Sequence, residues 1–426
     1  MKCGMHEVVI TPTLGSFMPG YFGNRKSTGV KDELYAKALV IESNDELLCL
    51  ISVDALFIPA KEAEAARKRL SKQWGIHEKQ IMISATHSHT GPPVRKGDDG
   101  SPNEPYLSFL VDKMCDAAMM AYQKRRPAKL GIGSGEEKDI SFNRRYVMKD
   151  GSVRTNPGFA NQDQIVRPAG PIDPEVTVMR IDDIDGEPIG VVVNFACHTD
   201  TVGGTEYSGD YPAEMSRVLK QVLGPDVVCL FLLGACGNIN HLDFMHGKAE
   251  QRQRHDAMGR ILAGEALKVR EKIHCIAEVP IQPSHSFYSF ELRRPSQEEV
   301  EEAKRILQAE DAGNEHFFAK QMLLIDQLTD HAATAEIQAI RIGEWAIVGL
   351  PGEIFVEFGL DLKQHSPFSK TMINTLCNGS IYGYVCTREA YAQGGYEPRM
   401  KTFSRIPEHA GENFVQHALD LLRCMR

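Results

Sequence analysis

Residues 80–89 read Gln-Ile-Met-Ile-Ser-Ala-Thr-His-Ser-His, a short apolar run that ends in two histidines. The run follows a strand predicted over residues 47–53 and a helix predicted over residues 61–74, where Ala and Leu recur among charged residues. Strand, helix and strand in this order are typical of an α/β fold, in which ligands bind beyond the carboxyl ends of strands. We therefore expect the residues after Ala85 to have a functional role.

Polar residues follow predicted strands at two further places. His198 follows one of them, and the segment 234–241, Gly-Ala-Cys-Gly-Asn-Ile-Asn-His, follows another. The additional strands are predicted at 176–180, 190–196, 227–233, 335–342, 345–350 and 371–376. Helices are predicted at 105–125, 248–272 and within 297–330, and mainly loop and hairpin structure at 131–175. These elements predict an α/β fold with mixed β-sheets flanked by helices, in one large domain over residues 1–426.

Composition excludes several classes of protein. The chain has 426 residues, with 48 Lys and Arg against 57 Asp and Glu, a formal net charge of -9 and no long basic run, so no nucleic-acid partner is expected. No apolar run approaches the roughly 20 residues of a membrane-spanning helix, and the N-terminus lacks a signal-peptide pattern, so no membrane anchor and a cytoplasmic location are expected. The ten cysteines form no CxxC pair and are expected to be free thiols. The oligomeric state is not specified.

His87 and His89 lie two residues apart. On an extended backbone both rings project to the same face and can approach one site, although the end of a strand need not let both bind one metal. Taken alone, the pair favours two hydrogen-bonded structural histidines, and the same interpretation applies to His198. The spacing alone leaves these roles open.

Glu353 and the tyrosines of the C-terminal region have ordinary interpretations too. Glu353 precedes a predicted helix, where an acidic residue in the first turn is favoured by the helix dipole. Tyr384 and Tyr396 can be core or surface aromatic residues. Their spacing does not assign them to a site.

Seven motifs occur in an order that resembles the neutral/alkaline ceramidase family, from about residue 5 to residue 400. They are Ile10-Thr-Pro-Thr-Leu-Gly15 with Met18-Pro-Gly-Tyr21, Ser84-Ala-Thr-His-Ser-His-Thr-Gly-Pro92, Asn194-Phe-Ala-Cys-His198, Ser208-Gly-Asp210, Gly234-Ala-Cys-Gly-Asn-Ile-Asn240, Leu350-Pro-Gly-Glu353 and Gly383-Tyr-Val-Cys-Thr-Arg-Glu389. The resemblance implies a mixed α/β catalytic domain with a buried zinc ion that hydrolyses the amide bond of N-acyl sphingosine.

The resemblance also implies roles for individual residues. The positions that match the zinc ligands of the family are His87, His198, Glu353 and Tyr384. His89 matches a histidine that supports the ligands or acts as acid and base, and Tyr396 and Arg144 match residues that stabilise the oxyanion near the scissile amide. Imidazole and carboxylate ligands suit Zn²⁺, which activates water and polarises a carbonyl.

The chain departs from the family pattern at three places. Gly237-Asn-Ile-Asn240-His stands where ceramidases have Gly-Asp-Val-Ser-Pro-Asn, so Asn240 replaces a serine. An asparagine is no practical nucleophile, so we expect direct attack by water, with Asn240 orienting the water or the substrate. Because the chain stops near residue 426 and shows no signal-peptide pattern, we expect neither the C-terminal immunoglobulin-like domain nor the secretion signal of the family. A small, soluble N-acylated substrate is therefore expected in place of membrane ceramide.

The sequence thus predicts a zinc-dependent hydrolase that cleaves an amide bond, or as the less favoured case an ester bond, by metal-activated water. One alternative is a true neutral ceramidase, which needs an apolar channel. A basic pocket lined by Arg144, Arg145, Arg388 or Arg399 would count against it. The other alternative is a non-catalytic zinc-binding protein, of which Asn240 would be the sign.

Overall fold

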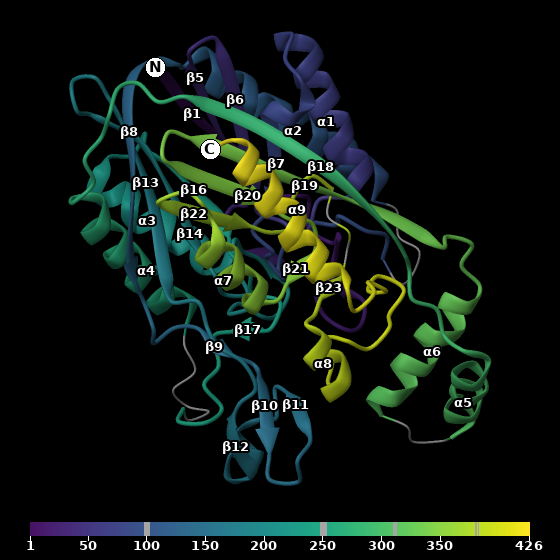
Figure 1. The fold of residues 1–426 in the computed structure, drawn as a ribbon. Helices are drawn as coiled ribbons and strands as arrows, with labels where there is room; N and C mark the ends of the chain where they lie inside the picture. Colours follow the sequence, from purple (N-terminus) through teal and green to yellow (C-terminus); the bar gives the residue numbers. More distant parts are fainter. Residues whose placement is uncertain (98–102, 248–253, 310–312, 380, 382) are drawn as a thin grey trace.

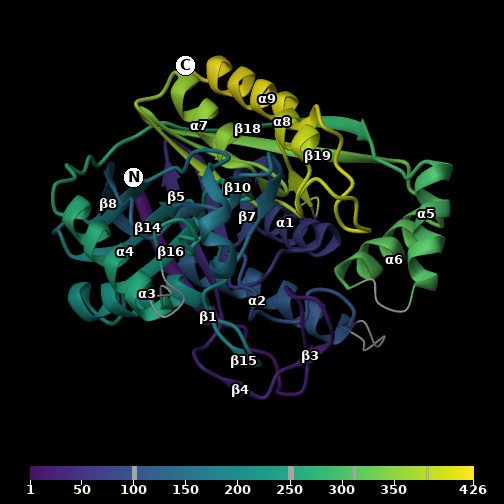
Figure 2. The ribbon, with the colours of Figure 1, turned by 90° about the horizontal axis from the view of Figure 1, so that it is seen from below.

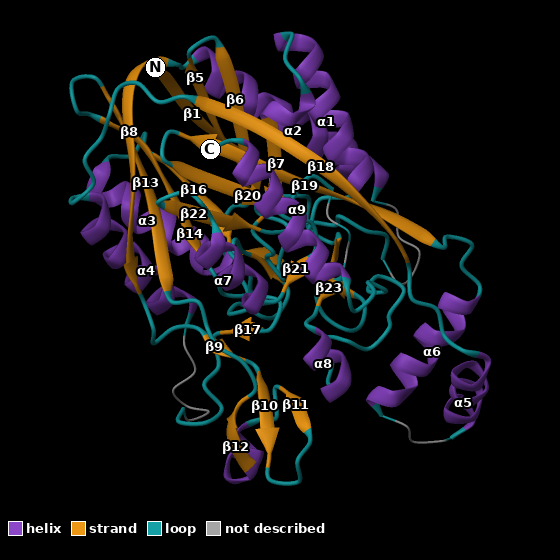
Figure 3. Ribbon diagram, viewed as in Figure 1, coloured by secondary structure: helices purple, strands orange, loops and turns teal. Residues whose placement is uncertain are grey.

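Two β-sheets pack face to face, and helices cover the outer face of each. This arrangement is seen in a computed structural model that describes residues 1–97, 103–247, 254–309, 313–379, 381 and 383–426 (Figures 1 and 3). The expected α/β fold with mixed sheets flanked by helices is therefore confirmed.

The larger sheet has eight strands, and the smaller one has four. In spatial order, the larger sheet consists of β16 (Val228–Leu233), β14 (Pro188–Phe195), β13 (Glu175–Asp183), β8 (Arg126–Glu136), β1 (Lys2–Val9), β5 (Tyr35–Ser43), β6 (Glu46–Val53) and β7 (Ile81–Ala85). The smaller sheet consists of β18 (Ile281–Glu291), β19 (Ala332–Ile342), β20 (Trp345–Gly349) and β22 (Lys370–Asn374). Parallel pairs, β6 with β7, β14 with β16 and β20 with β22, occur beside antiparallel ones, so both sheets are mixed.

The helices and the short strands complete the fold. The α-helices are α1 (Ala60–Trp74), α2 (Glu104–Gln123), α3 (Asp210–Leu223), α4 (His255–Arg270), α5 (Gln297–Gln308), α6 (Asn314–Asp326), α7 (Val356–His365), α8 (Arg388–Gln393) and α9 (Ala410–Cys424), and the 3-10 helices are η1 (Glu78–Gln80) and η2 (Phe159–Gln164). The short strands are β2 (Phe17–Met18), β3 (Arg25–Lys26), β4 (Gly29–Val30), β9 (Phe142–Asn143), β10 (Arg145–Met148), β11 (Val153–Thr155), β12 (Ile165–Pro168), β15 (Glu206–Tyr207), β17 (Ile239–Asn240), β21 (Glu353–Ile354) and β23 (Tyr384–Val385).

Alternating side chains explain why the layers stack. In β6, Cys49, Ile51 and Val53 join the core under α1 to α4, while Leu48 and Leu50 join the core between the two sheets. On the far side, α7 and α9 cover the smaller sheet, opposite to α2, α3 and α4 (Figure 2). Because β6, β7 and β16 are buried on both faces, their sequences are mostly apolar.

Two predictions about local structure need correction. Residues 131–136, expected within a segment of mainly loop and hairpin structure, continue the long strand β8, because their backbone pairs with β13. Glu353 lies in β21, and the helix after it begins only at Val356, so Glu353 is not an acid of the first helical turn. The helix predicted from residue 248 is observed as α4, and residues 248–253 lie outside the described residues.

The curvature of the larger sheet brings distant strand ends together. Ser52 Oγ on β6 donates a hydrogen bond to the carbonyl of Phe231 on β16, at 2.6 Å, although these strands are not neighbours in the sheet. Beyond the strands, Thr199 Oγ1 donates to the carbonyl of Thr86, at 2.7 Å, and the amide of His89 donates to the carbonyl of Thr199. The segments that follow β7 and β14 therefore lie side by side.

Helices α5 and α6 form a separate excursion between β18 and β19, away from the stacked layers (Figure 1). The helix start expected at Ser296 is confirmed, because Ser296 and Glu299 form a reciprocal capping box.

Among the described residues, no helix combines the length and the apolar character needed to cross a membrane. All ten cysteines are free thiols, as expected.

Candidate metal centre

Two imidazole nitrogens and one carboxylate oxygen converge on a single buried point. His87 Nε2 lies 3.3 Å from His198 Nε2, and Glu353 Oε2 lies 3.4 Å from the first and 3.3 Å from the second. His89 Nε2 lies 3.4 Å from His87 Nε2. One ligand atom from each of the three histidines can be chosen so that all lie within 4.8 Å of one another.

Backbone carbonyls fix the orientation of the His87 and His198 rings through their Nδ1 atoms. His87 Nδ1 lies 2.8 Å from the carbonyl of Leu56, and His198 Nδ1 lies 2.8 Å from the carbonyl of Cys236. Because a carbonyl can only accept, each Nδ1 carries the proton, and Nε2 of the neutral ring keeps a lone pair. Burial, followed by the charge of Arg144, lowers the pKa of His198 to about 4, which favours the neutral ring.

The convergence of His87 and His89 has a different cause from the expected one. The prediction assumed an extended backbone, but His87 has φ of 68°, in the left-handed region. The two rings are nearly perpendicular, with centroids 4.9 Å apart. A turn directly after β7, and not strand periodicity, therefore brings them to one place.

This arrangement fits a bound cation. Lone pairs on His87 Nε2 and His198 Nε2 cannot hydrogen-bond each other, and the buried Glu353 Oε2 has no hydrogen-bond partner among the described residues. Buried polar atoms without partners are costly, whereas neutral imidazoles and a carboxylate are the ligands that zinc prefers. Hydrogen bonds from the opposite ring nitrogens to carbonyls are also typical of metal-binding histidines.

Tyr384 is placed beside Glu353 by strand pairing. Strands β21 and β23 are parallel, and Glu353 is the register partner of Tyr384. Tyr384 is buried, and burial together with the nearby Glu353 raises the pKa of its hydroxyl. Two predicted ligands that are 31 positions apart in the chain thus become neighbours.

His89 is held differently from His87 and His198. Its Nδ1 lies 3.8 Å from Asp200 Oδ1, which accepts a hydrogen bond from the Tyr21 hydroxyl. Arg25 stacks on the Tyr21 ring and donates to the carbonyl of His89, at 2.6 Å. Burial and then the other two histidines lower the pKa of His89. Asp200 and Arg25 were not predicted from the sequence, and only the Met18-Pro-Gly-Tyr21 motif pointed to this loop.

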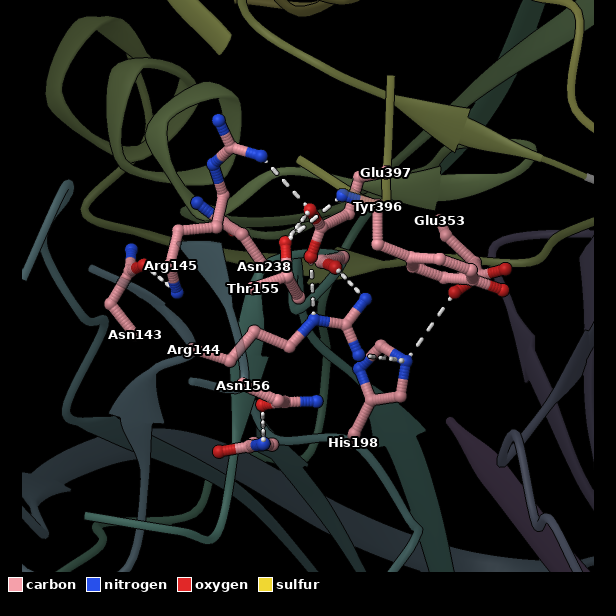
Figure 4. Close-up of polar contacts among 12 residues, drawn as sticks. Asn143, Arg144, Arg145, Thr155, Asn156, His198, Asn238, Glu353, Tyr396 and Glu397 are labelled. Carbon is pink, nitrogen blue, oxygen red and sulfur yellow. Dashed lines mark hydrogen bonds and ion pairs between the residues drawn. The ribbon is translucent and has the colours of Figure 1, made fainter. Parts of the chain in front are cut away.

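Arg144 also approaches this point, and its guanidinium lies between Glu397 and His198 (Figure 4). Its Nη1 lies 3.4 Å from His198 Nε2, and its guanidinium carbon lies 5.4 Å from the centre of the Tyr384 ring. Its Nε donates to Glu397, a fully buried carboxylate that no sequence signal identified except its place after Tyr396. The Tyr396 ring lies 5.7 Å from the Tyr384 ring.

Comparison with known proteins gives a family match for the N-terminal part of the chain. Residues 3–210 match the family described as neutral/alkaline non-lysosomal ceramidase, N-terminal. The N-terminal part of the chain, just under half of its length, therefore resembles this family. The match covers the segment with His87, His89, Arg144 and His198, whereas Glu353 lies beyond it.

Individual ceramidases are similar to this chain at low identity. Neutral ceramidase of Pseudomonas aeruginosa is 26% identical over 196 residues, and neutral ceramidase B of Dictyostelium discoideum is 24% identical over 210 residues. These matches cover 43% and 46% of this chain but only 28% of each ceramidase. Neutral ceramidase of Mycobacterium tuberculosis is 23% identical over 462 aligned positions, which cover 90% of this chain and 70% of that protein.

The fold is that of a solved ceramidase. The crystal structure of neutral ceramidase from Pseudomonas aeruginosa superimposes with a TM-score of 0.74 at 19% identity and covers 99% of this chain and 74% of that chain. A structure described as ceramidase complexed with C2 gives a TM-score of 0.73 at 17% identity, over 100% of this chain and 75% of that chain.

The segment 234–240 contacts the centre through the carbonyls of Cys236 and Gly237, which bond His198 and Arg144. Asn240 Nδ2 donates to Asn156 Oδ1, at 2.8 Å, and Asn240 Oδ1 accepts from the amide of Leu242, at 3.0 Å. The amide of Asn156 in turn donates to the carbonyl of Arg144. Asn240 therefore has protein partners at both ends of its side chain.

Two of the four arginines considered as a basic lining are paired away from the centre, and Arg145 shares with Arg144 the carboxylate of Glu397. Arg388 bonds Glu412, Arg399 bonds Glu315, and Arg145 bonds Glu397. Aromatic residues surround Tyr396 instead, with Phe22 and Phe318 at ring distances of 6.1 and 6.2 Å. Phe317 on α6 lies 4.5 Å from Phe22, whose side chain is 57% exposed.

A cavity of about 490 Å³ lies elsewhere, between α1, η1, β18 and β19. Its polar lining includes His285, which bonds Glu336, and Arg67, which pairs with the same carboxylate. None of the predicted site residues lines it.

Proposed function

We propose that this chain is a zinc-dependent hydrolase that cleaves the amide bond of a small N-acylated substrate by metal-activated water. The observation that carries the proposal is the convergence of His87 Nε2, His198 Nε2 and Glu353 Oε2 within 3.3–3.4 Å of one another, with no proton available between the two rings. The match of residues 3–210 to the neutral/alkaline ceramidase family supports hydrolysis of an amide.

The ligands in this proposal are His87, His198, Glu353 and Tyr384. When bound, zinc lowers the pKa of a coordinated water and polarises a carbonyl. A mixed set of imidazole, carboxylate and phenol oxygen favours catalysis over a purely structural role, since structural zinc sites usually have four Cys or His ligands. This argument counts against the non-catalytic alternative.

His89 is proposed as the acid and base. Its Nε2 lies 3.4 Å from Nε2 of His87, and no carbonyl accepts a hydrogen bond from its Nδ1. Its lowered pKa leaves the ring neutral, so Nε2 can accept a proton from water and later deliver it to the leaving amine.

Arg144 and Tyr396 are proposed to stabilise the oxyanion of the tetrahedral intermediate. Arg144 Nη1 faces the centre, and its charge persists because Tyr384, Glu397 and Glu353 raise the pKa of the guanidinium despite burial, which acts to lower it. Burial also raises the pKa of Tyr396, so its hydroxyl stays protonated and can donate a hydrogen bond. Fixed donors of this kind supply much of the rate enhancement in acyl transfer.

Water is proposed to attack directly. The amide of Asn240 cannot act as a nucleophile, and burial raises the pKa of the nearby Cys236 thiol, so little thiolate is present. Hydrolysis in ¹⁸O-labelled water under single-turnover conditions, with mass spectrometry of the quenched protein, tests this step. A kinetically competent acyl-enzyme would overturn the direct-water mechanism.

A true neutral ceramidase is the second candidate. The rings of Tyr384, Tyr396, Phe22 and Phe317 lie in a row from the centre to the exposed Phe22, and this apolar surface would suit an acyl chain or another apolar group. Turnover of N-acyl sphingosine and of water-soluble N-acyl amino acids, each with zinc-loaded and zinc-free protein, separates the substrates. Stoichiometric zinc without turnover of any N-acyl compound would favour the non-catalytic alternative.

A further inference from the structure

Glu397 is a buried carboxylate that both neighbouring arginines share. Its Oε1 accepts from Arg144 Nε, at 2.8 Å, and its Oε2 accepts from Arg145 Nη1, at 2.9 Å, and from Thr155 Oγ1, at 2.7 Å (Figure 4). The side chain of Glu397 is fully inaccessible to solvent. Such a carboxylate is normally retained where it fixes the geometry of its partners, because its desolvation is costly.

The hydrogen bonds of Arg144 leave one nitrogen directed at the metal centre. Nε is bound by Glu397, and Nη2 donates to the carbonyl of Gly237, at 2.6 Å. With two of its three nitrogens fixed, the planar guanidinium cannot rotate, and Nη1 remains facing His198 at 3.4 Å. The position of Nη1 therefore depends on Glu397.

Glu397 is itself held in place. Arg145 Nη2 donates to the carbonyl of Gly394, at 2.8 Å, and Arg145 Nη1 donates to Glu397. Both terminal nitrogens of the Arg145 guanidinium are therefore hydrogen-bonded. Lys401 Nζ donates to the carbonyl of Tyr396, at 2.9 Å, and lies 4.1 Å from the centre of the Tyr396 ring. The segment that carries Glu397 thus positions Tyr396 and Arg144 together.

We propose that Glu397 is a positioning residue that holds Arg144 Nη1 at the metal centre, with Thr155 and Arg145 fixing its second oxygen. The inference rests on the proposed function, since it makes the oxyanion-stabilising donor depend on a carboxylate that touches neither substrate nor metal. Replacing this carboxylate displaces Nη1 while the ligand atoms keep their places.

The test compares Glu397→Gln with a matched control elsewhere in the fold. Asp182 is also fully buried between two arginines, with Arg180 Nε at 2.6 Å and Arg270 Nη2 at 2.7 Å. Both Glu397→Gln and Asp182→Asn are expected to lower the melting temperature. Only Glu397→Gln is expected to lower kcat, by about 10²-fold with KM changed less than about threefold, while zinc stoichiometry stays at the wild-type value.

Crystal structures of the variants give a readout that does not need activity. In Glu397→Gln, Arg144 is expected to leave its wild-type position beside His198. An unmoved Arg144, an unchanged kcat, or an equal loss of kcat in Asp182→Asn would overturn the inference. If the wild type hydrolyses no N-acyl compound, the proposed function fails, and the position of Arg144 still decides the inference.

Thr155→Val provides a milder variant in case Glu397→Gln does not fold. It removes the hydrogen bond to Oε2 of Glu397 and the one that Thr155 Oγ1 accepts from the amide of Tyr396, at 3.2 Å, and it leaves all charges in place. A fall in kcat of roughly threefold to tenfold with a shifted or disordered Arg144 is expected. Wild-type kcat with an unmoved Arg144 in this variant would contradict the inference.

Discussion

At the scale of single residues, His87 and His198 differ from other histidines because carbonyls orient their rings and leave both Nε2 atoms facing each other. We predict that zinc purifies with the protein in stoichiometric amount and that His87→Ala or His198→Ala abolishes both metal and activity, since each removes a direct ligand. Elemental analysis and turnover measure this. His246→Ala, at a 76% exposed side chain, is the control. Unchanged metal in both site variants would refute the ligand assignment.

His89 provides a second prediction. If it transfers protons and does not bind the metal, His89→Ala should keep most of the zinc and lower turnover by roughly 10²- to 10⁴-fold. Zinc content and kcat are measured on the same preparation. Loss of zinc in His89→Ala together with its retention in His87→Ala would reverse the roles of the two rings.

Asn240 provides a third prediction. The side chain of Asn240 bridges Asn156 and Leu242. Asn240→Ala removes both hydrogen bonds and should make the segment beside Arg144 less rigid. We therefore expect the enzyme to be slowed by about tenfold without being stopped. Asn240→Ser, which restores the residue type of the family motif, tests whether a hydroxyl can act there. Complete loss of activity in Asn240→Ala would mean that this residue takes a direct part in the reaction.

At the scale of elements, the pairing of β21 with β23 sets the distance between Glu353 and Tyr384. Gly352 precedes this pair at φ of 88°, and a Cβ there would lie 3.0 Å from the carbonyl of Gly383, which accepts from the amide of Glu353. We predict that Gly352→Ala lowers the free energy of unfolding by about 1–3 kcal/mol and weakens zinc binding.

A glycine inside a helix provides the control for this prediction. A Cβ added at Gly264 in α4 would meet no atom within 4 Å outside the backbone of its own helix, so Gly264→Ala should raise the free energy of unfolding by about 0.5–1 kcal/mol. Denaturant unfolding and zinc titration measure both variants. Wild-type zinc affinity in Gly352→Ala would show that the register of β21 and β23 does not control the centre.

At the scale of the whole molecule, buried acids make stability depend on pH. Burial raises the pKa of Asp54 from its ordinary value of 3.8 to about 6, and its carboxylate accepts from the amide of Tyr35 and the hydroxyl of Thr86. Between these two values the folded state binds more protons than the unfolded state, so the free energy of unfolding falls as the pH rises.

Asp54→Asn is predicted to remove this component. Denaturant unfolding at several pH values between 3.8 and about 6 should give a shallower decline for the variant than for the wild type. Asp420→Asn, at a 59% exposed side chain, should keep the wild-type pH profile. Identical profiles for Asp54→Asn and the wild type would contradict the prediction.

The layered α/β fold could be predicted from local sequence, because hydrophobic periodicity is a local property. The apolar runs of β6, β7, β14 and β16 and the turn at Gly343 were all predictable from neighbouring residues. The candidate ligands were recognised only through the resemblance to ceramidases, since spacing left each histidine open to a structural role.

Which of these residues meet depends on tertiary packing. Glu353 and Tyr384 became neighbours through the pairing of two-residue strands, and His87 reached His198 through a left-handed turn and the curvature of the large sheet. Glu397, Asp200 and Arg25 carried no sequence signal of their own. Their roles arise from contacts between segments far apart in the chain, and no local pattern encodes such contacts because they depend on how the layers pack.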